Sequence, residues 1–90
     1  MREDMDARVP AMVRMFRFQW EPAQACHVLL YPEGMVKLST SAGEILKRVD
    51  GTRTVRGIID DLKDAFPGAE LDNDVCNFLT QARENGWITL

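Results

Sequence analysis

The residues in this sequence that could bind a metal or act as a nucleophile are few and poorly placed for either role. His27 is the only histidine, and it neighbours Cys26. Adjacent residues of a strand face opposite sides of a sheet, so this pair cannot share a metal ion. Cys76 lies near Asp72 and Asp74, whose charges disfavour the reactive thiolate. We therefore expect no catalytic residue and no metal site.

Carboxylates gather at two places that could suggest calcium binding or acid–base catalysis. The second cluster lacks the glycine and the final glutamate of a calcium-binding EF-hand loop. A solvated helix face and favourable charge at a helix N-terminus explain both clusters. The glycines are isolated, so no phosphate-binding loop or cofactor is expected. The clusters are Asp60, Asp61 and Asp64, and then Glu70, Asp72 and Asp74.

Length and charge exclude further classes of function. A chain of 90 residues forms one domain with a thin core, which leaves little room for an enzyme pocket. The net charge is −3, whereas a nucleic-acid-binding protein normally presents a basic face. No apolar run approaches the length of a membrane span, and the first residues do not resemble a signal peptide. With two distant, unpaired cysteines, these features predict a cytoplasmic protein without membrane or nucleic-acid partners.

The first half of the chain has the two-residue period of strands. Residues 1–11 are polar and aperiodic, which predicts a flexible arm before a single domain at 12–90. Residues 13–20 alternate, and residues 25–31 are almost continuously apolar, as in a central strand covered on both faces. Tyr31-Pro32-Glu33-Gly34 predicts a tight turn. A third, edge strand is then expected over 35–40.

After position 40 the apolar residues repeat at helical spacing. The segment Ser41-Ala42-Gly43-Glu44 fits a capping box and predicts the start of a helix that ends at Asp50-Gly51. Further helices are expected from Thr54 to Phe66 and from Asp72 to Asn85, followed by an apolar tail at Trp87 and Ile88 that folds back on the core. The predicted fold is α+β and winged-helix-like: a three-stranded antiparallel sheet followed by three helices.

Two binding functions compete for this fold. A winged-helix DNA-binding regulator would place residues 72–85 in the major groove, although this segment carries Asp72, Asp74 and Glu84 against Arg83. The alternative partner is an extended peptide that pairs with the edge strand at 35–40, whose only charge is Lys37. The sequence leaves open whether the arm or a second copy of the chain covers this edge.

The order and spacing of several short motifs resemble the PqqD family of pyrroloquinoline quinone biosynthesis. The first is the strand–turn–strand segment from Val28 to Leu38, which contains Tyr31-Pro32-Glu33-Gly34. Each motif is weak alone, and together they cover about residues 10–87. The others are Ser41-Ala42-x-Glu44-Ile45-Leu46, Asp50-Gly51-x-Arg53-Thr54-Val55, Ile58-Ile59-x-x-Leu62 and Asp74-Val75-x-x-Phe78-Leu79, ending at Gly86-Trp87.

The resemblance implies a non-catalytic peptide chaperone, a recognition element for ribosomally synthesised and modified peptides. Such a protein binds the precursor peptide PqqA and presents it to the radical S-adenosylmethionine enzyme PqqE. The peptide is expected to add as a strand beside the third strand and against the third helix. A monomer and a homodimer with swapped elements both stay open. The expected peptide-binding residues are Met35, Val36, Lys37, Leu38, Ser39, Thr40, Asp74, Asn77, Phe78, Gln81 and Ala82.

Two positions depart from the family pattern. Ser39 stands where asparagine often follows the third strand, which we expect to alter a peptide contact. Gly57 stands where a glutamate would complete a capping box, which should weaken one helix cap.

Overall fold

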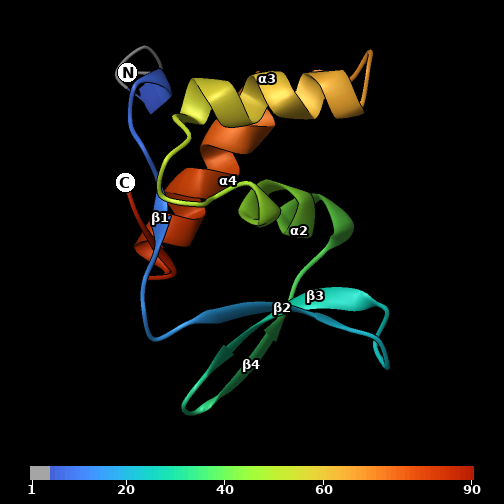
Figure 1. The fold of residues 1–90 in the computed structure, drawn as a ribbon, viewed down its shortest axis with the longest axis vertical. Helices are drawn as coiled ribbons and strands as arrows, with labels where there is room; N and C mark the ends of the chain where they lie inside the picture. Colours follow the sequence, from blue (N-terminus) through green and yellow to red (C-terminus); the bar gives the residue numbers. More distant parts are fainter. Residues whose placement is uncertain (1–4) are drawn as a thin grey trace.

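The computed structural model describes residues 5–90 and contains a sheet with helices on one face (Figure 1). The predicted order, a three-stranded antiparallel sheet followed by three helices, is confirmed. Two short strands, one near each end of the chain, form a separate ribbon. The elements are β1 (Ala11–Met12), β2 (Arg17–Glu21), β3 (Cys26–Tyr31), β4 (Gly34–Lys37), α2 (Thr40–Lys47), α3 (Val55–Ala65), α4 (Asp72–Glu84) and β5 (Ile88–Thr89).

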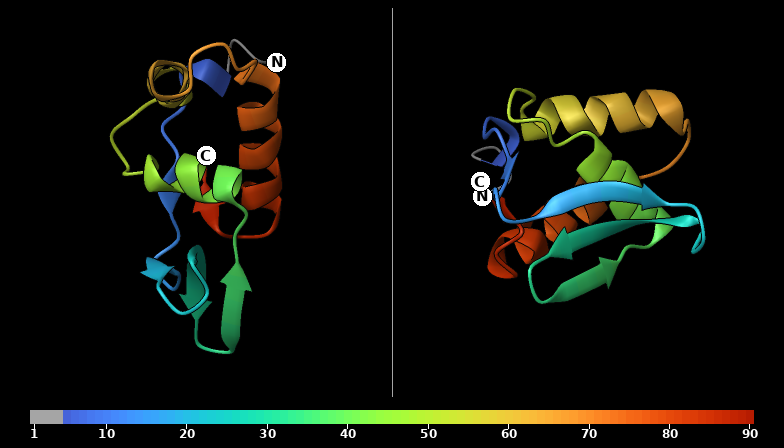
Figure 2. Two further views of the ribbon diagram at one scale, coloured as in Figure 1. Left: turned by 90° about the vertical axis from the view of Figure 1, so that its right-hand side faces the viewer. Right: turned by 60° about the horizontal axis from the view of Figure 1, so that its bottom comes forward.

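The sheet has the order β2-β3-β4, with both pairs antiparallel. The central strand is β3, where Val28 and Leu29 are fully buried. Figure 2 shows the helices on one face of this sheet. Val28 and Leu29 point to opposite faces, so the middle of β3 is covered on both sides, as expected. Tyr31 pairs with Gly34 across the predicted Pro32-Glu33 turn.

The third strand is shorter than its alternation predicts, and the helix after it begins earlier. Strand β4 ends at Lys37, and α2 begins at Thr40. Ser39 is extended and its Oγ accepts a hydrogen bond from the Ala42 N–H at 3.1 Å. Serine at this position satisfies an N–H group that the first helical turn leaves free. The predicted capping box starting at Ser41 is therefore wrong by two residues.

The helices pack the expected apolar stripes into one core. Thr54 caps α3, because its Oγ1 accepts a hydrogen bond from the Gly57 N–H at 3.0 Å. Within residues 5–90, no helix has both the length and the apolar character needed to cross a bilayer. The core cluster comprises Leu29, Leu38, Ala42, Ile45, Leu46, Val49, Val55, Ile58, Ile59, Leu62, Val75, Leu79, Ala82 and Ile88.

The two ends of the described chain meet in the β1–β5 ribbon. Met12 pairs with Ile88, which is 2% exposed, so the apolar tail does fold back on the core as expected. The residues described within the segment predicted to be a flexible arm, 5–11, contact the domain. Pro10 is fully buried, and the Arg8 carbonyl accepts a hydrogen bond from the Val55 N–H at 2.8 Å. The mobility of the arm stays a prediction.

Strain is present in the turn between β2 and β3. Ala25 has a φ of 53°, in the left-handed region that costs a residue with a Cβ about 1 kcal/mol or more. We expect Ala25→Gly to raise the free energy of unfolding by about 0.5–1 kcal/mol, measured by urea denaturation. Ala23→Gly in the same turn serves as the control and should lower it. A loss of stability in Ala25→Gly would contradict the assigned strain.

Candidate peptide-binding site

The outer edge of β4 offers unpaired backbone groups. Within residues 5–90 no segment pairs with this side of the strand. The Leu38 N–H donates to the His27 carbonyl at 3.0 Å, so Leu38 and, by the alternation of an antiparallel ladder, Val36 turn their backbone groups toward β3. Met35 and Lys37 therefore turn their N–H and C=O groups outward. These four groups can form a ladder with an added strand.

An apolar groove of about 610 Å³ begins just beyond the end of β4. It runs between the N-terminal half of α2 and α4, and it extends to the end of α3. Figure 2 (left) shows α4 and β4 on the same side of the molecule. A peptide that leaves the β4 edge can therefore continue into the groove. The lining residues are Ser39, Thr40, Ser41, Ala42, Glu44, Ile45, Leu62, Phe66, Ala69, Leu71, Asp74, Val75, Asn77 and Phe78.

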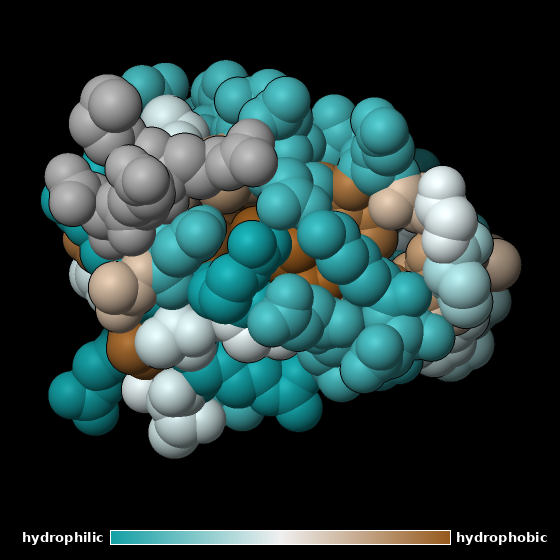
Figure 3. Space-filling model, turned by 90° about the horizontal axis from the view of Figure 1, so that it is seen from above, coloured by the Kyte–Doolittle hydropathy of each residue, from teal (hydrophilic) through white to brown (hydrophobic). Residues whose placement is uncertain are grey.

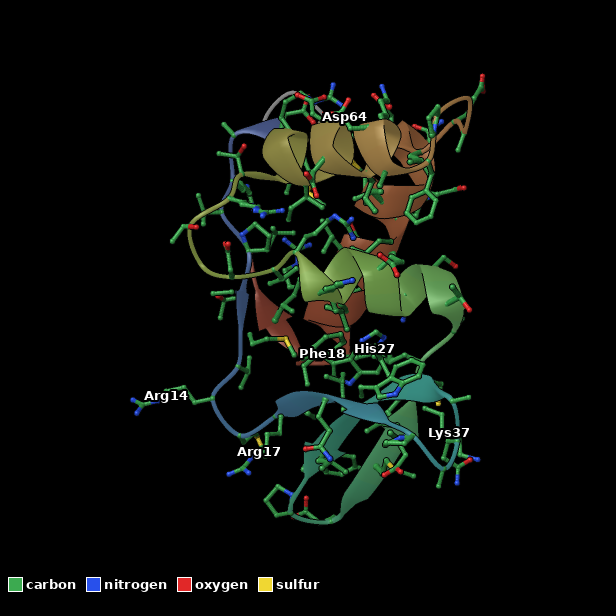
Figure 4. The ribbon with its side chains drawn as sticks, turned by 45° about the vertical axis from the view of Figure 1, so that its right-hand side comes forward. Arg14, Arg17, Phe18, His27, Lys37 and Asp64 are labelled. Atoms are coloured by element: carbon green, nitrogen blue, oxygen red, sulfur yellow. The ribbon has the colours of Figure 1, made fainter. Side chains whose placement is uncertain are left out.

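Helix α2 forms one wall of the groove, and it packs very closely on the sheet. Gly43 is buried, and a Cβ at this position would lie 2.8 Å from Nδ1 of His27. The His27 ring is itself held by Phe18, stacked at 4.7 Å, and by Trp20, edge-on at 5.0 Å. Figure 4 shows Phe18 and His27 between the sheet and α2. His27, for which the sequence indicated no metal-binding role, thus supports the helix that forms the groove wall.

Helix α4 forms the opposite wall through residues one turn apart. Asp74, Asn77 and Phe78 have the spacing of neighbours on one helix face, and all three line the groove. Phe78 is half-buried and also contacts the Trp87 ring at 6.5 Å between centroids. It therefore serves both the core and the groove.

The expected binding residues fall in different places, and Val36 is partly buried against the core. Ser39, Thr40, Asp74, Asn77 and Phe78 line the groove together. The outward backbone groups at positions 35 and 37 belong to the β4 edge, while the side chain at 38 is part of the core. The residue at 82 is 0% exposed, so its side chain cannot reach a peptide, and the exposed side chain at 81 is not part of the groove lining.

Several groove residues escaped the sequence prediction. Leu62, Phe66 and Leu71 lie at the end of α3 and in the loop before α4, and Ile45 lies in α2. From the sequence, the residues at 45, 62 and 66 have the spacing of ordinary core residues of amphipathic helices, and the residue at 71 precedes a predicted helix. Phe66 gives the one usable signal, because it is a large aromatic residue directly before Pro67, where a helix must end. It is 45% exposed, which is unusual for phenylalanine.

An ion-pair network fastens the start of α4 to α3 and so fixes the far end of the groove. Asp72 accepts hydrogen bonds from Lys63 Nζ at 2.7 Å and from Arg56 Nη2 at 2.9 Å. The hydrogen bonds from these two cations lower the pKa of Asp72 to about 2, and the bond from Lys63 has the larger effect.

Seen from above, the face over α3 is mainly hydrophilic, with hydrophobic surface visible between polar side chains (Figure 3).

This network predicts a loss of stability in acid. The pKa of Asp72 is lower in the folded chain, about 2, than its ordinary value near 3.8, so its ionisation stabilises the fold above about pH 4. That contribution should disappear as the pH falls from about 4 to 2. We expect Asp72→Asn to be less stable than the parent chain at pH 7 and equal to it near pH 2, measured by thermal unfolding. Asp64→Asn, on an exposed part of α3, is the control and should not change the pH profile. An equal deficit at both pH values would contradict the assignment.

Comparison with known proteins assigns the chain to a family. The family model described as Coenzyme PQQ synthesis protein D (PqqD) matches residues 26–88, which include the sheet edge and both groove walls. The chain belongs to the PqqD family. A protein named PqqA binding protein from Stutzerimonas stutzeri is 55% identical over 91 residues, covering 100% of this chain and 99% of the relative. Another from Pseudomonas aeruginosa (strain UCBPP-PA14) is 58% identical over 83 residues, covering 91% of this chain and 90% of the relative.

A solved member of the PqqD family has the same fold. It is the solution NMR structure of the PqqD truncation of Methylobacterium extorquens PqqCD, described as a functional and stand-alone recognition element for ribosomally synthesised and modified peptides. The TM-score is 0.74 at 26% identity, and the match covers 98% of this chain and 99% of that one. The predicted family and its winged-helix-like arrangement of sheet and helices are therefore confirmed.

Proposed function

We propose that this protein is a non-catalytic chaperone that binds the precursor peptide PqqA by strand addition. The observation that carries the proposal is the open β4 edge, which leads directly into the apolar groove between α2 and α4. The relatives named PqqA binding proteins support the identity of the ligand. Backbone hydrogen bonds to Met35 and Lys37 supply affinity, and side chains in the groove select the sequence.

The chaperone acts by holding the peptide close to the enzyme that modifies it. Burying one large apolar side chain in the groove contributes about 1.5–3 kcal/mol. The bound peptide then reaches the radical S-adenosylmethionine enzyme PqqE at an effective concentration near the millimolar range. The protein itself supplies binding and orientation, while the chemistry belongs to the enzyme.

An isotope-edited NMR titration tests the proposal. The ¹⁵N-labelled chain is titrated with the synthetic PqqA peptide of Stutzerimonas stutzeri. Shifts should concentrate at residues 35–40, at the start of α2 and along the exposed face of α4. A scrambled peptide of the same composition is the control. No shifts at millimolar peptide would reject the peptide-binding function.

The groove predicts a specific effect for the exposed aromatic residue at its far end. We expect Phe66→Ala to weaken PqqA binding by about 5- to 30-fold, because a large apolar contact with the peptide is lost. Stability should change little, since the side chain is 45% exposed. Calorimetric titration measures the affinity. Val9→Ala, at a hydrophobic side chain that is 42% exposed and absent from the groove lining, is the matched control. Equal affinities of the two variants would count against the groove.

No observation favours the alternative, a winged-helix DNA-binding regulator. The helix that would enter the major groove presents Asp74 and Glu84 to solvent. These carboxylates would approach the phosphates of DNA and oppose binding.

A further inference from the structure

The sheet has a second open edge, on the side away from the peptide site. Strand β2 is the other outer strand, and within residues 5–90 no segment pairs with its outer side (Figure 2, right). Proteins usually protect such an edge with charge, proline or a covering segment. Trp20 lies on this strand and is 52% exposed, which leaves half of a large aromatic side chain in water. The open edge and the exposed aromatic residue together indicate a surface for a partner.

The backbone of β2 turns the polar groups of Phe18 and Trp20 toward this open side. In β3 the His27 carbonyl accepts a hydrogen bond from the Leu38 N–H, so the adjacent residues 26 and 28 turn toward β2. Their partners in β2 are residues 21 and 19, which therefore bond to β3. Phe18 and Trp20 alternate with these residues, so each presents one N–H and one C=O to an added strand.

The side chains of β2 are complementary to a second copy of the same strand. Arg17 and Glu21 share the face opposite to Phe18, and within residues 5–90 neither forms an ion pair. Figure 4 shows Arg17 pointing away from the helices and Phe18 toward them. In an antiparallel pair of two β2 strands centred on Gln19, Arg17 of each copy lies opposite Glu21 of the other. Phe18 then lies opposite Trp20.

This register satisfies the backbone and the charges together. Two β2 strands can bond only through their outward residues, so the centre of the pair lies at position 18, 19 or 20. A pair centred on Trp20 would set Phe18 opposite Pro22, which has no N–H to donate. A pair centred on Phe18 would set Arg17 opposite Gln19 and leave Glu21 unmatched. Centring on Gln19 matches every outward N–H with an outward C=O and each cation with an anion.

We infer that two copies of this chain associate through β2 as a symmetric dimer with one continuous sheet. The two copies are related by a twofold axis, so both make the same contacts and the assembly is closed. Each end of the combined sheet is then a β4 strand, and the groove lining contains no residue of β2. The dimer therefore keeps both peptide sites open. One pair of short strands buries a small area, so we expect a dissociation constant of about 10 μM to 1 mM.

Charge reversal tests this register directly. Arg17→Glu sets like charges opposite each other on both sides of the twofold axis, so the dissociation constant should rise at least about fivefold at low salt. Glu21→Arg should have the same effect. The double variant Arg17→Glu/Glu21→Arg restores opposite charges and should return to within about twofold of the parent. An equimolar mixture of the two single variants should likewise form a mixed dimer.

Sedimentation equilibrium measures the dissociation constants, and thermal melts verify that each variant is folded. Arg14→Glu, just outside β2, changes the net charge by the same amount as Arg17→Glu and is the matched control. Its dissociation constant should stay within about twofold of the parent. Equal dimerisation of the parent and both single variants, or a double variant as weak as the single ones, would overturn the inferred register.

Concentration-dependent amide shifts of the ¹⁵N-labelled parent chain locate the interface. The amides of Phe18 and Trp20 should shift as the concentration rises, and those of Met35 and Lys37 should not. Shifts at Met35 and Lys37 instead would place the second copy on the peptide edge and overturn the inference. A parent chain that stays monomeric at about 1 mM would overturn it as well. PqqA binding to β4 does not depend on any of these results, because it involves the other edge of the sheet.

Discussion

Lys37→Pro should lower the affinity for the PqqA peptide at least about tenfold and leave the domain folded. The reason is the direction of the backbone at this position. The Lys37 N–H points away from β3, so proline there removes a donor that the protein itself does not use. The proline ring would also occupy the space of an added strand. Calorimetric titration gives the affinity, and circular dichroism verifies the fold.

Two matched variants separate this backbone effect from other causes. Lys37→Gln removes the charge and keeps the N–H, so its affinity should fall by less than about fivefold. Val36→Pro removes an N–H that points toward β3, so it should destabilise the β3–β4 hairpin. Strand addition would be wrong if Lys37→Pro were folded and bound the peptide like the parent chain.

Gly43→Ala should destabilise the fold by about 1–2 kcal/mol, although alanine is normally the better helix residue by about 1 kcal/mol. A Cβ at this position would lie 2.8 Å from Nδ1 of His27, whose ring is held by Phe18 and Trp20. Helix α2 must therefore move away from the sheet. Because α2 forms a groove wall, peptide affinity should fall as well. Urea denaturation gives the free energy of unfolding.

The matched control is Gly57, a partly buried glycine in the first turn of the next helix. A Cβ at Gly57 would meet Thr54 Oγ1 at 3.4 Å, an ordinary contact. Gly57→Ala should therefore stabilise the chain by about 0.5–1 kcal/mol. In a His27→Ala background, Gly43→Ala should lose most of its cost, because the contact with Nδ1 is gone and only the Cβ of residue 27, at 3.3 Å, stays close. If Gly43→Ala stabilised the parent chain, the close contact between α2 and His27 would not limit its stability.

Local signals in the sequence were sufficient for most of the elements. The alternation before position 38, the Pro32-Glu33 turn and the apolar stripes of α3 and α4 each depend on residues close together in the chain. The edge position of β4 also follows, because it is the last of three strands joined by short turns. The resemblance to the PqqD family then placed the expected peptide site on this edge and on α4.

The departure from the family pattern at position 39 shows that the role of a single residue can depend on the structure around it. Serine in place of the common asparagine was expected to alter a peptide contact. Its Oγ instead caps α2, a role that asparagine also performs well. Ser39 lines the groove too, so the substitution retains the cap whatever its effect on the peptide.

What the sequence alone determined about this protein is its family, the order of its elements and the strand that offers a free edge. The tertiary structure decided the rest: the β1–β5 ribbon, the contact of Gly43 with His27, and the groove that Ile45, Leu62, Phe66 and Phe78 complete. These features join residues that are distant in the chain. An apolar stripe in the sequence indicates only that one helix face is shielded from water. The packing of the three helices determines which apolar residues of that face remain accessible to a ligand.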